Sequence, residues 1–323
     1  MNIDHGKTHW TEEQLDMLRS SVRELMSAYG LTQAAVSRES TVPAATLSQF
    51  LSVSYAGDNN AIAKRLSQWL NARLQEQQVN ALAPPAPTFT QTKTADSVLS
   101  VLRAAQTLGD MGLVMGEPGV GKTAAALQYA KTNPRVAMAT GAPAIASAAA
   151  ILRVLLEAMK KTPRGRGYAS KFELTTLARQ VFEAGWLIVI DEAQHLQMEA
   201  LEELRAIHDE TGAGIVLIGN ASVLSRIQGN QRNPAFAQLY SRIGVRVILP
   251  KTPPADVDAV LATMGIEQPE VLQVAYAIAG KDNLRQVVKA ARRAQMVARQ
   301  NREDLSREHL RLAYSRLGGV LPR

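Results

Sequence analysis

A glycine-rich stretch of eight residues, 116–123, constrains this chain more than any other feature. It reads G-E-P-G-V-G-K-T and lies between a short apolar run at 111–115 and a helix-forming segment at 124–131. Glycines let backbone N–H groups converge on phosphate oxygens, and the following helix adds positive potential at its first turn. The order of strand, loop and helix therefore predicts a P-loop that binds ATP or GTP.

Each part of this loop has an expected role in holding the nucleotide. Lys122 is placed to reach the β- and γ-phosphates, and the hydroxyl of Thr123 is placed to hold Mg²⁺. A glycine-rich turn that only imitates the pattern is the alternative, but it would require neither the strand nor the helix. The predicted cofactor-binding residues of the loop are Gly116, Glu117, Pro118, Gly119, Val120, Gly121, Lys122 and Thr123.

Cysteine content and hydropathy exclude several classes of protein. The 323-residue chain contains no cysteine, so disulfides and thiolate metal sites are excluded, and its five histidines lack metal-ligand spacing. The polar N-terminus has no apolar signal region, and no apolar run approaches the ~18 residues that span a bilayer. We therefore expect a cytoplasmic protein with no membrane partner.

The positive charge of the chain is concentrated near its C-terminus. The formal net charge is +7, and residues 281–323 hold eleven Lys and Arg against four Asp and Glu, an excess of the same size. Such a surface is a candidate for binding a polyanion. A solvated helical face rich in arginine is the alternative.

The chain separates into four parts by composition and periodicity. In the first part, residues 1–79, helical periodicity runs over 11–79, and residues 80–93 form a Pro/Thr-rich linker. Residues 94–252 alternate apolar runs with helix-length segments, and residues 253–323 have a wholly helical pattern. We therefore predict an all-α helix-turn-helix domain, a linker, an α/β core with a parallel central sheet, and a C-terminal helical lid. The expected strands are 111–115, 136–139, 186–190, 215–218 and 245–249, and the expected lid helices are 255–264, 269–279, 283–300 and 306–316.

Two carboxylates follow the apolar run 187–190, namely Asp191 and Glu192. A buried strand would deliver both to the edge of the sheet where the P-loop lies. Asp191 is then placed to bind Mg²⁺ through water, and Glu192 to orient and deprotonate the attacking water. Adjacent strand residues point to opposite faces, so the two carboxylates can serve different roles. A surface acidic pair after a strand is the alternative.

A later strand ends in Gly219-Asn220, and the amide of Asn220 is a candidate sensor of the γ-phosphate or the attacking water. The same dipeptide is also ordinary turn chemistry. Charge that develops on the γ-phosphoryl group calls for a further cation, usually an arginine from a neighbouring subunit. Arg242 and Arg232 are the candidates, with Arg226 weaker, although each also suits a surface salt bridge.

Arg285 begins the long basic helix of the predicted lid, five residues after Gly280. From this position a closing lid would bring the guanidinium over the bound nucleotide and would link hydrolysis to domain movement. The alternative is that Arg285 is simply one of the cations of the basic helix.

Together these motifs resemble those of the AAA+ ATPases. The stretches 116–123, 190–196, 201–205 and 236–243, and the order of the domains, narrow the resemblance to the target-DNA activators of Mu-like transposing phages, across nearly the whole chain. The resemblance implies an ATP-dependent, DNA-binding ATPase that forms helical filaments on double-stranded DNA, largely without sequence specificity, and activates a DDE transposase. It also implies that nucleotide chemistry involves Lys122, Thr123, Asp191, Glu192 and Asn220.

Two regions are candidates for contact with DNA. In the predicted helix-turn-helix, Ser48 and Gln49 would face outward on the second helix, but that face lacks arginine and Thr41 replaces the usual turn glycine. A protein-interaction module is therefore the alternative. Between two helices of the α/β core, a basic stretch is placed to grip the phosphate backbone without reading sequence, unless its charge serves only solubility. Its cations are Lys160, Lys161, Arg164, Arg166 and Lys171.

Two other functions fit the same motifs. One is a DNA-binding regulator that uses ATP as a switch with little hydrolysis, which an intact Glu192 argues against. The other is a helicase-loading or secretion-associated AAA+ motor that acts on protein partners, which absence of DNA binding at low salt with ATP would favour.

Overall fold

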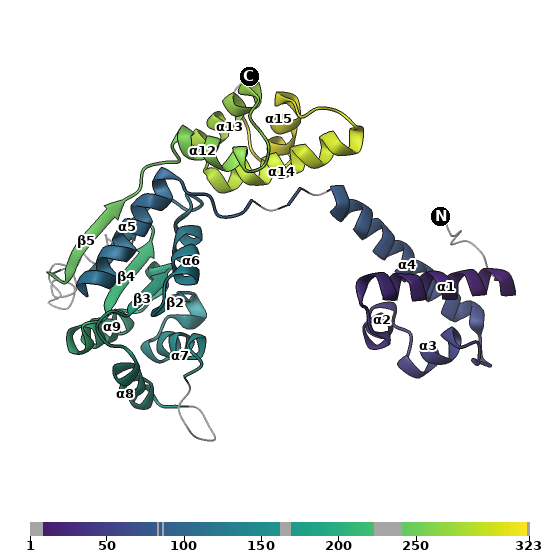
Figure 1. Ribbon diagram of the computed structural model, residues 1–323, viewed down its shortest axis with the longest axis horizontal. Helices are drawn as coiled ribbons and strands as arrows, with labels where there is room; N and C mark the ends of the chain where they lie inside the picture. The colour runs from purple at the N-terminus through teal and green to yellow at the C-terminus, as the bar shows by residue number, and fades with distance from the viewer. Residues whose placement is uncertain (1–8, 83, 86, 162–168, 223–240, 322–323) are drawn as a thin grey trace. The chain divides into compact units, whose positions relative to one another are not determined.

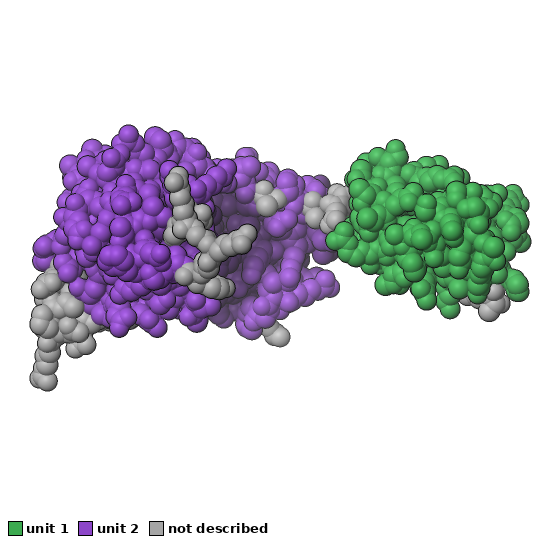
Figure 2. All heavy atoms as spheres, turned by 90° about the horizontal axis from the view of Figure 1, so that it is seen from below, with its two compact units in different colours: residues 1–83 green, residues 84–323 purple. Residues whose placement is uncertain are grey.

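The computed structural model describes residues 9–82, 84–85, 87–161, 169–222 and 241–321. The chain forms two compact units, residues 1–83 and residues 84–323, which Figure 2 distinguishes by colour. Among the helices of the described ranges, none is both long enough and apolar enough to cross a bilayer.

The N-terminal unit is built from α1 (Glu12–Tyr29), α2 (Gln33–Ser40), α3 (Ala44–Leu51) and α4 (Asn59–Leu82), which confirms its predicted all-α character. Side-chain caps from Thr11 and Thr32 begin α1 and α2. The turn between α2 and α3 contains Thr41 in the left-handed region, with φ 57°. The hydrophobic core of this N-terminal unit includes Leu18, Val22, Val36, Leu47, Phe50 and Leu66.

The second unit has a parallel five-stranded sheet, as the sequence predicts. Hydrogen bonding gives the order β2-β3-β4-β1-β5, and every pair of neighbouring strands is parallel. The three inner strands are buried along their whole length, whereas β5 at one edge alternates between half-buried and exposed residues. The strands are β1 (Met111–Met115), β2 (Val136–Thr140), β3 (Leu187–Asp191), β4 (Gly214–Gly219) and β5 (Ile243–Ile248).

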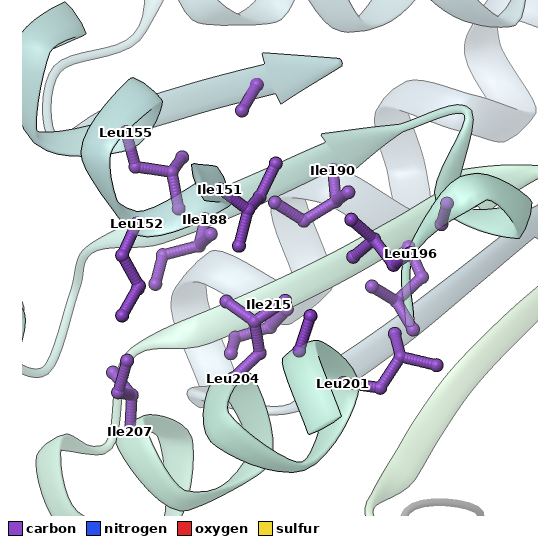
Figure 3. Packing of buried hydrophobic residues seen from close by; sticks show 14 of the residues in the cluster. Ile151, Leu152, Leu155, Ile188, Ile190, Leu196, Leu201, Leu204, Ile207 and Ile215 are labelled. Carbon is purple, nitrogen blue, oxygen red and sulfur yellow. The ribbon is translucent and has the colours of Figure 1, made fainter. Parts of the chain in front are cut away.

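Helices cover both faces of this sheet (Figure 1). On one face α5 (Lys93–Leu108) and α6 (Lys122–Thr132) pack against the strands. The other face is covered by three helices that share one apolar core with β3 and β4 (Figure 3). These helices are α7 (Ala148–Ala158), α8 (Lys171–Val181) and α9 (Met198–Thr211).

The C-terminal part is helical, which confirms the predicted lid. It has a hydrophobic core of its own that includes Val257, Ile278, Val287, Leu310 and Tyr314. Burial and a hydrogen bond from its hydroxyl to Asp282 raise the pKa of Tyr314 to about 12. The lid helices are α12 (Pro254–Ala262), α13 (Pro269–Lys281), α14 (Leu284–Asn301) and α15 (Arg307–Ser315).

Candidate nucleotide site

The glycine loop joins β1 to α6 at the C-terminal edge of the sheet. Two of its glycines, Gly119 and Gly121, have φ of 81° and 109°, which L side chains rarely adopt. The N–H of Gly116 donates to the carbonyl of Gly219 with 3.2 Å between N and O, so the loop is fixed to the end of β4. The glycines therefore shape a cradle at a helix N-terminus, as phosphate binding requires.

Lys122 is the first residue of α6 and is buried. Its Nζ donates to the carbonyls of Gly116 and Glu117, with N–O distances of 2.7 and 2.9 Å. Burial lowers the pKa of Lys122, while the nearby carboxylates of Glu192 and Asp191 act in the opposite direction. The amine thus lies inside the loop, close to both carboxylates and without an ion-pair partner among the described residues.

Thr123 and Asp191 meet across the site. The Thr123 hydroxyl donates to the Asp191 carboxylate with 2.6 Å between Oγ1 and Oδ2. The other carboxylate oxygen accepts the N–H of Glu192 at 2.9 Å, and the side chain is buried at 2% exposure. One hydroxyl and one carboxylate fit Mg²⁺, which usually completes its shell with phosphates and water. No cluster of three acidic or histidine ligands occurs within the described part of the chain.

Glu192 follows the tip of β3 in a left-handed backbone conformation, with φ 51°. Strain of this kind persists only when the surroundings impose it, and it is common at active sites. Sequence reasoning missed two neighbours of Glu192. Gln194 donates a side-chain hydrogen bond to the Glu192 carboxylate, and Gly141 is so close that an added Cβ would lie 2.7 Å from the Glu192 carbonyl oxygen.

A cavity of about 540 Å³ lies against the loop, within the size range of small-molecule sites. Glu192 and Arg285 line it, and the backbone N–H of Arg285 donates to the carbonyl of Gly119 at 3.2 Å. Sequence reasoning missed Lys289, one turn further along α14, and also residues of the predicted linker. The linker residues in the cavity wall are Pro87, Thr88, Phe89, Thr90 and Thr92.

Asn220 directly follows β4, whose end is bonded to the glycine loop. Its side-chain oxygen accepts hydrogen bonds from the backbone and hydroxyl of Ser222, both of which are turn contacts. The amide nitrogen is the end of this side chain that can donate to a ligand.

Arg242 lies away from the cavity of its own chain. Its guanidinium donates to both carboxylate oxygens of Asp209 on α9, at 2.8 and 3.4 Å, and Arg205 also pairs with this carboxylate. The hydrogen bond from Arg242 holds the pKa of Asp209 below its usual value. Arg226 and Arg232 lie outside the described residues.

The candidate DNA-contacting residues occupy three places. Ser48 and Gln49 are exposed on α3, next to the buried Leu47 and Phe50. Lys160 and Lys161 are exposed directly after α7. Lys171 begins α8 and lies 3.5 Å from a carboxylate oxygen of Glu203. Arg164 and Arg166 lie outside the described residues.

In P-loop enzymes of the AAA+ class, a helical domain packs over the phosphate-binding edge of a parallel sheet. The contact of α14 with Gly119, together with the paired Thr123 and Asp191, places this chain in that class of ATPases. Comparison with known families agrees, since the AAA domain family matches residues 105–227 and the family described as Mu B transposition protein, C terminal, matches residues 241–317.

Full-length relatives identify the family. The ATP-dependent target DNA activator B of Escherichia phage Mu is 34% identical over 306 residues, which cover 93% of this chain and 95% of the relative. The Mu-like prophage FluMu DNA transposition protein B of Haemophilus influenzae is 33% identical over 78% of this chain and 87% of its own length. The chain therefore belongs to the Mu B transposition protein family.

A solved structure agrees on the fold. Cdc6p of Pyrobaculum aerophilum has a TM-score of 0.56 at 16% identity, and the match covers 72% of this chain and 69% of that one.

Proposed function

We propose that this protein binds ATP with Mg²⁺, assembles on double-stranded DNA as a helical homo-oligomer, and in that form activates or directs a DDE transposase. The relative from phage Mu is by name an ATP-dependent target DNA activator, and the match covers nearly all of both chains. Hydrolysis, stimulated by DNA and by assembly, then releases the protein from the DNA.

The 2.6 Å contact between Thr123 and Asp191, with Glu192 beside it on the cavity wall, is the observation that carries the proposal. Mg²⁺ would supply positive charge that offsets the charge of the phosphates. Thr123 and Asp191 would hold the ion, Lys122 would turn from the loop carbonyls to the phosphates, and Glu192 would accept a proton from the attacking water. Asn220 orients that water or the γ-phosphate, and Arg285 contacts the nucleotide from the lid.

Assembly is proposed because phosphoryl transfer in sites of this kind commonly uses an arginine that a neighbouring subunit supplies. Arg242, held by Asp209 on the outside of α9, is 44% exposed and is therefore accessible to a neighbouring subunit. Arg232 is the second candidate. DNA is proposed to lie against the cations Lys160, Lys161, Arg164, Arg166 and Lys171. Their contacts to phosphates would not depend on the base sequence. Ser48 and Gln49 are proposed as weaker contacts.

Electron microscopy tests the proposal. The purified protein is mixed with ATP and Mg²⁺, with and without long duplex DNA, and phosphate release is measured on the same samples. We expect filaments that need ATP and DNA, and faster hydrolysis when both are present. A protein that remains monomeric with nucleotide, Mg²⁺ and duplex would refute the proposal.

A further inference from the structure

The last residues of the predicted linker form part of the nucleotide cavity. We call residues 87–92 the wall segment, since all but Gln91 line the cavity, as do residues of α14. The wall segment has no helix or strand of its own. Backbone without regular hydrogen bonds needs other contacts to hold one conformation, because each fixed residue costs conformational entropy.

One end of the wall segment is held by a buried carboxylate from the lid. Asp256 on α12 is 1% exposed, and its two oxygens accept the N–H groups of Lys93 and Thr94 at 3.0 and 3.3 Å. These N–H groups belong to the first turn of α5, which intrahelical bonds leave without acceptors. A carboxylate at a helix N-terminus is favoured by charge as well as by hydrogen bonding.

An arginine from the lid contacts the chain three residues before the other end of the wall segment. Arg292 on α14 donates through Nε and Nη2 to the carbonyl of Pro84, with distances of 3.3 and 3.1 Å. Arg285 and Lys289 precede it by seven and three residues, so all three lie on one face of α14. The first two line the cavity. The helix face that meets the nucleotide site therefore also holds the chain that leads into the wall segment.

We propose that Asp256 and Arg292 are positioning residues that fix the wall segment in the form that binds nucleotide. This inference rests on the proposed function of the cavity. Loss of either contact leaves the wall segment to be ordered at the moment of binding, which weakens the apparent affinity. Lys122, Thr123 and Asp191, the groups proposed to act at the phosphates, are held by their hydrogen bonds within the loop and to each other, and they remain in place.

The test compares four variants of the full chain by titration with a fluorescent ADP analogue. Asp256→Asn and Arg292→Ala should each weaken binding about tenfold, the scale of a lost charge-assisted hydrogen bond. They should raise KM for ATP and leave kcat within about twofold. The matched controls are Asp258→Asn, whose carboxylate accepts the Tyr276 hydroxyl inside the lid, and Arg293→Ala, which lines a separate cavity with Leu312. Both controls should bind like the unmodified protein.

Hydrogen exchange provides a second readout that a merely structural role would not move. Amides of residues 87–94 should exchange faster in Asp256→Asn and Arg292→Ala than in their controls, with the melting temperature of Arg292→Ala unchanged within a few degrees. If Asp256→Asn does not fold, Arg292→Ala decides alone. Unchanged affinity and exchange in the folded variants would overturn the inference, whereas failure of the unmodified protein to bind ADP would overturn the proposed function instead.

Discussion

The hydroxyl of Thr123 donates a hydrogen bond to the carboxylate of Asp191, 68 residues further along the chain. Because these two groups are the proposed ligands of Mg²⁺, Thr123→Ala should lower hydrolysis at saturating ATP by about 10²-fold, as expected when one contact to transition-state charge is removed. Phosphate release with varied Mg²⁺ measures the effect. Thr123→Ser keeps the hydroxyl and should retain most activity; equal rates for both variants would remove Thr123 from the metal site.

Glu192→Gln should bind ATP and hydrolyse it at least 10²-fold more slowly, because the amide cannot accept a proton from water. ATP-dependent assemblies on DNA should then persist much longer, as followed by light scattering after a chase with excess competitor DNA. Lys122→Ala is the matched control, since it should not assemble at all. Rapid disassembly of Glu192→Gln complexes in the presence of ATP would contradict the role given to Glu192.

Mixing two inactive variants tests whether Arg242 acts on a neighbour. Arg242→Ala should lower hydrolysis by about 10³-fold, the lower end of the range for such arginines. Glu192→Gln should bind ATP and assemble but hydrolyse slowly, and it keeps its own Arg242. A mixture of the two should recover part of the activity on DNA, since Glu192→Gln subunits can supply Arg242 to the intact sites of Arg242→Ala subunits. No recovery at any ratio would favour Arg232 as the residue supplied in trans.

As the pH rises, the affinity for ADP should begin to fall at a lower pH than the pKa of an ordinary lysine predicts. Burial lowers the pKa of Lys122 in the free protein, and phosphates bind its protonated form. Affinity is therefore constant below that lowered pKa and decreases as pH rises through it, at values below the usual ~10.4. Calorimetric titration between pH 7.5 and 10 measures the curve. Lys122→Arg, which stays charged, should bind more weakly but without this decrease.

The double substitution Lys160→Ala with Lys161→Ala should weaken DNA binding equally for all sequences and leave ATP binding intact. If both amines contact phosphates, the slope of log affinity against log salt should decrease in magnitude by ~1.8, at ~0.9 for each phosphate. Fluorescence anisotropy at several salt concentrations gives the slope. Lys251→Ala, an exposed cation between β5 and α12, is the control. An unchanged slope would place these lysines outside the interface.

Sequence reasoning predicted the features that depend on neighbours in the chain. The glycine loop and the Asp191-Glu192 pair could be recognised because each motif consists of a few consecutive residues. The periodicity of apolar residues predicted the parallel sheet and the helical lid. Contacts between distant segments could not be predicted in this way. Asp256 is 163 residues from Lys93, and the closeness of Gly141 to Glu192 arises only because β2 lies beside β3.

The placement of Phe89 and its neighbours in the cavity wall has a practical consequence for dissecting this enzyme. A truncated ATPase that started at residue 94 would retain every sequence motif of the nucleotide site. It would nevertheless be open on one side, and Asp256 would have lost the Lys93 amide. Weak nucleotide binding by such a fragment would therefore reflect where it was cut, and would say little about the intact molecule.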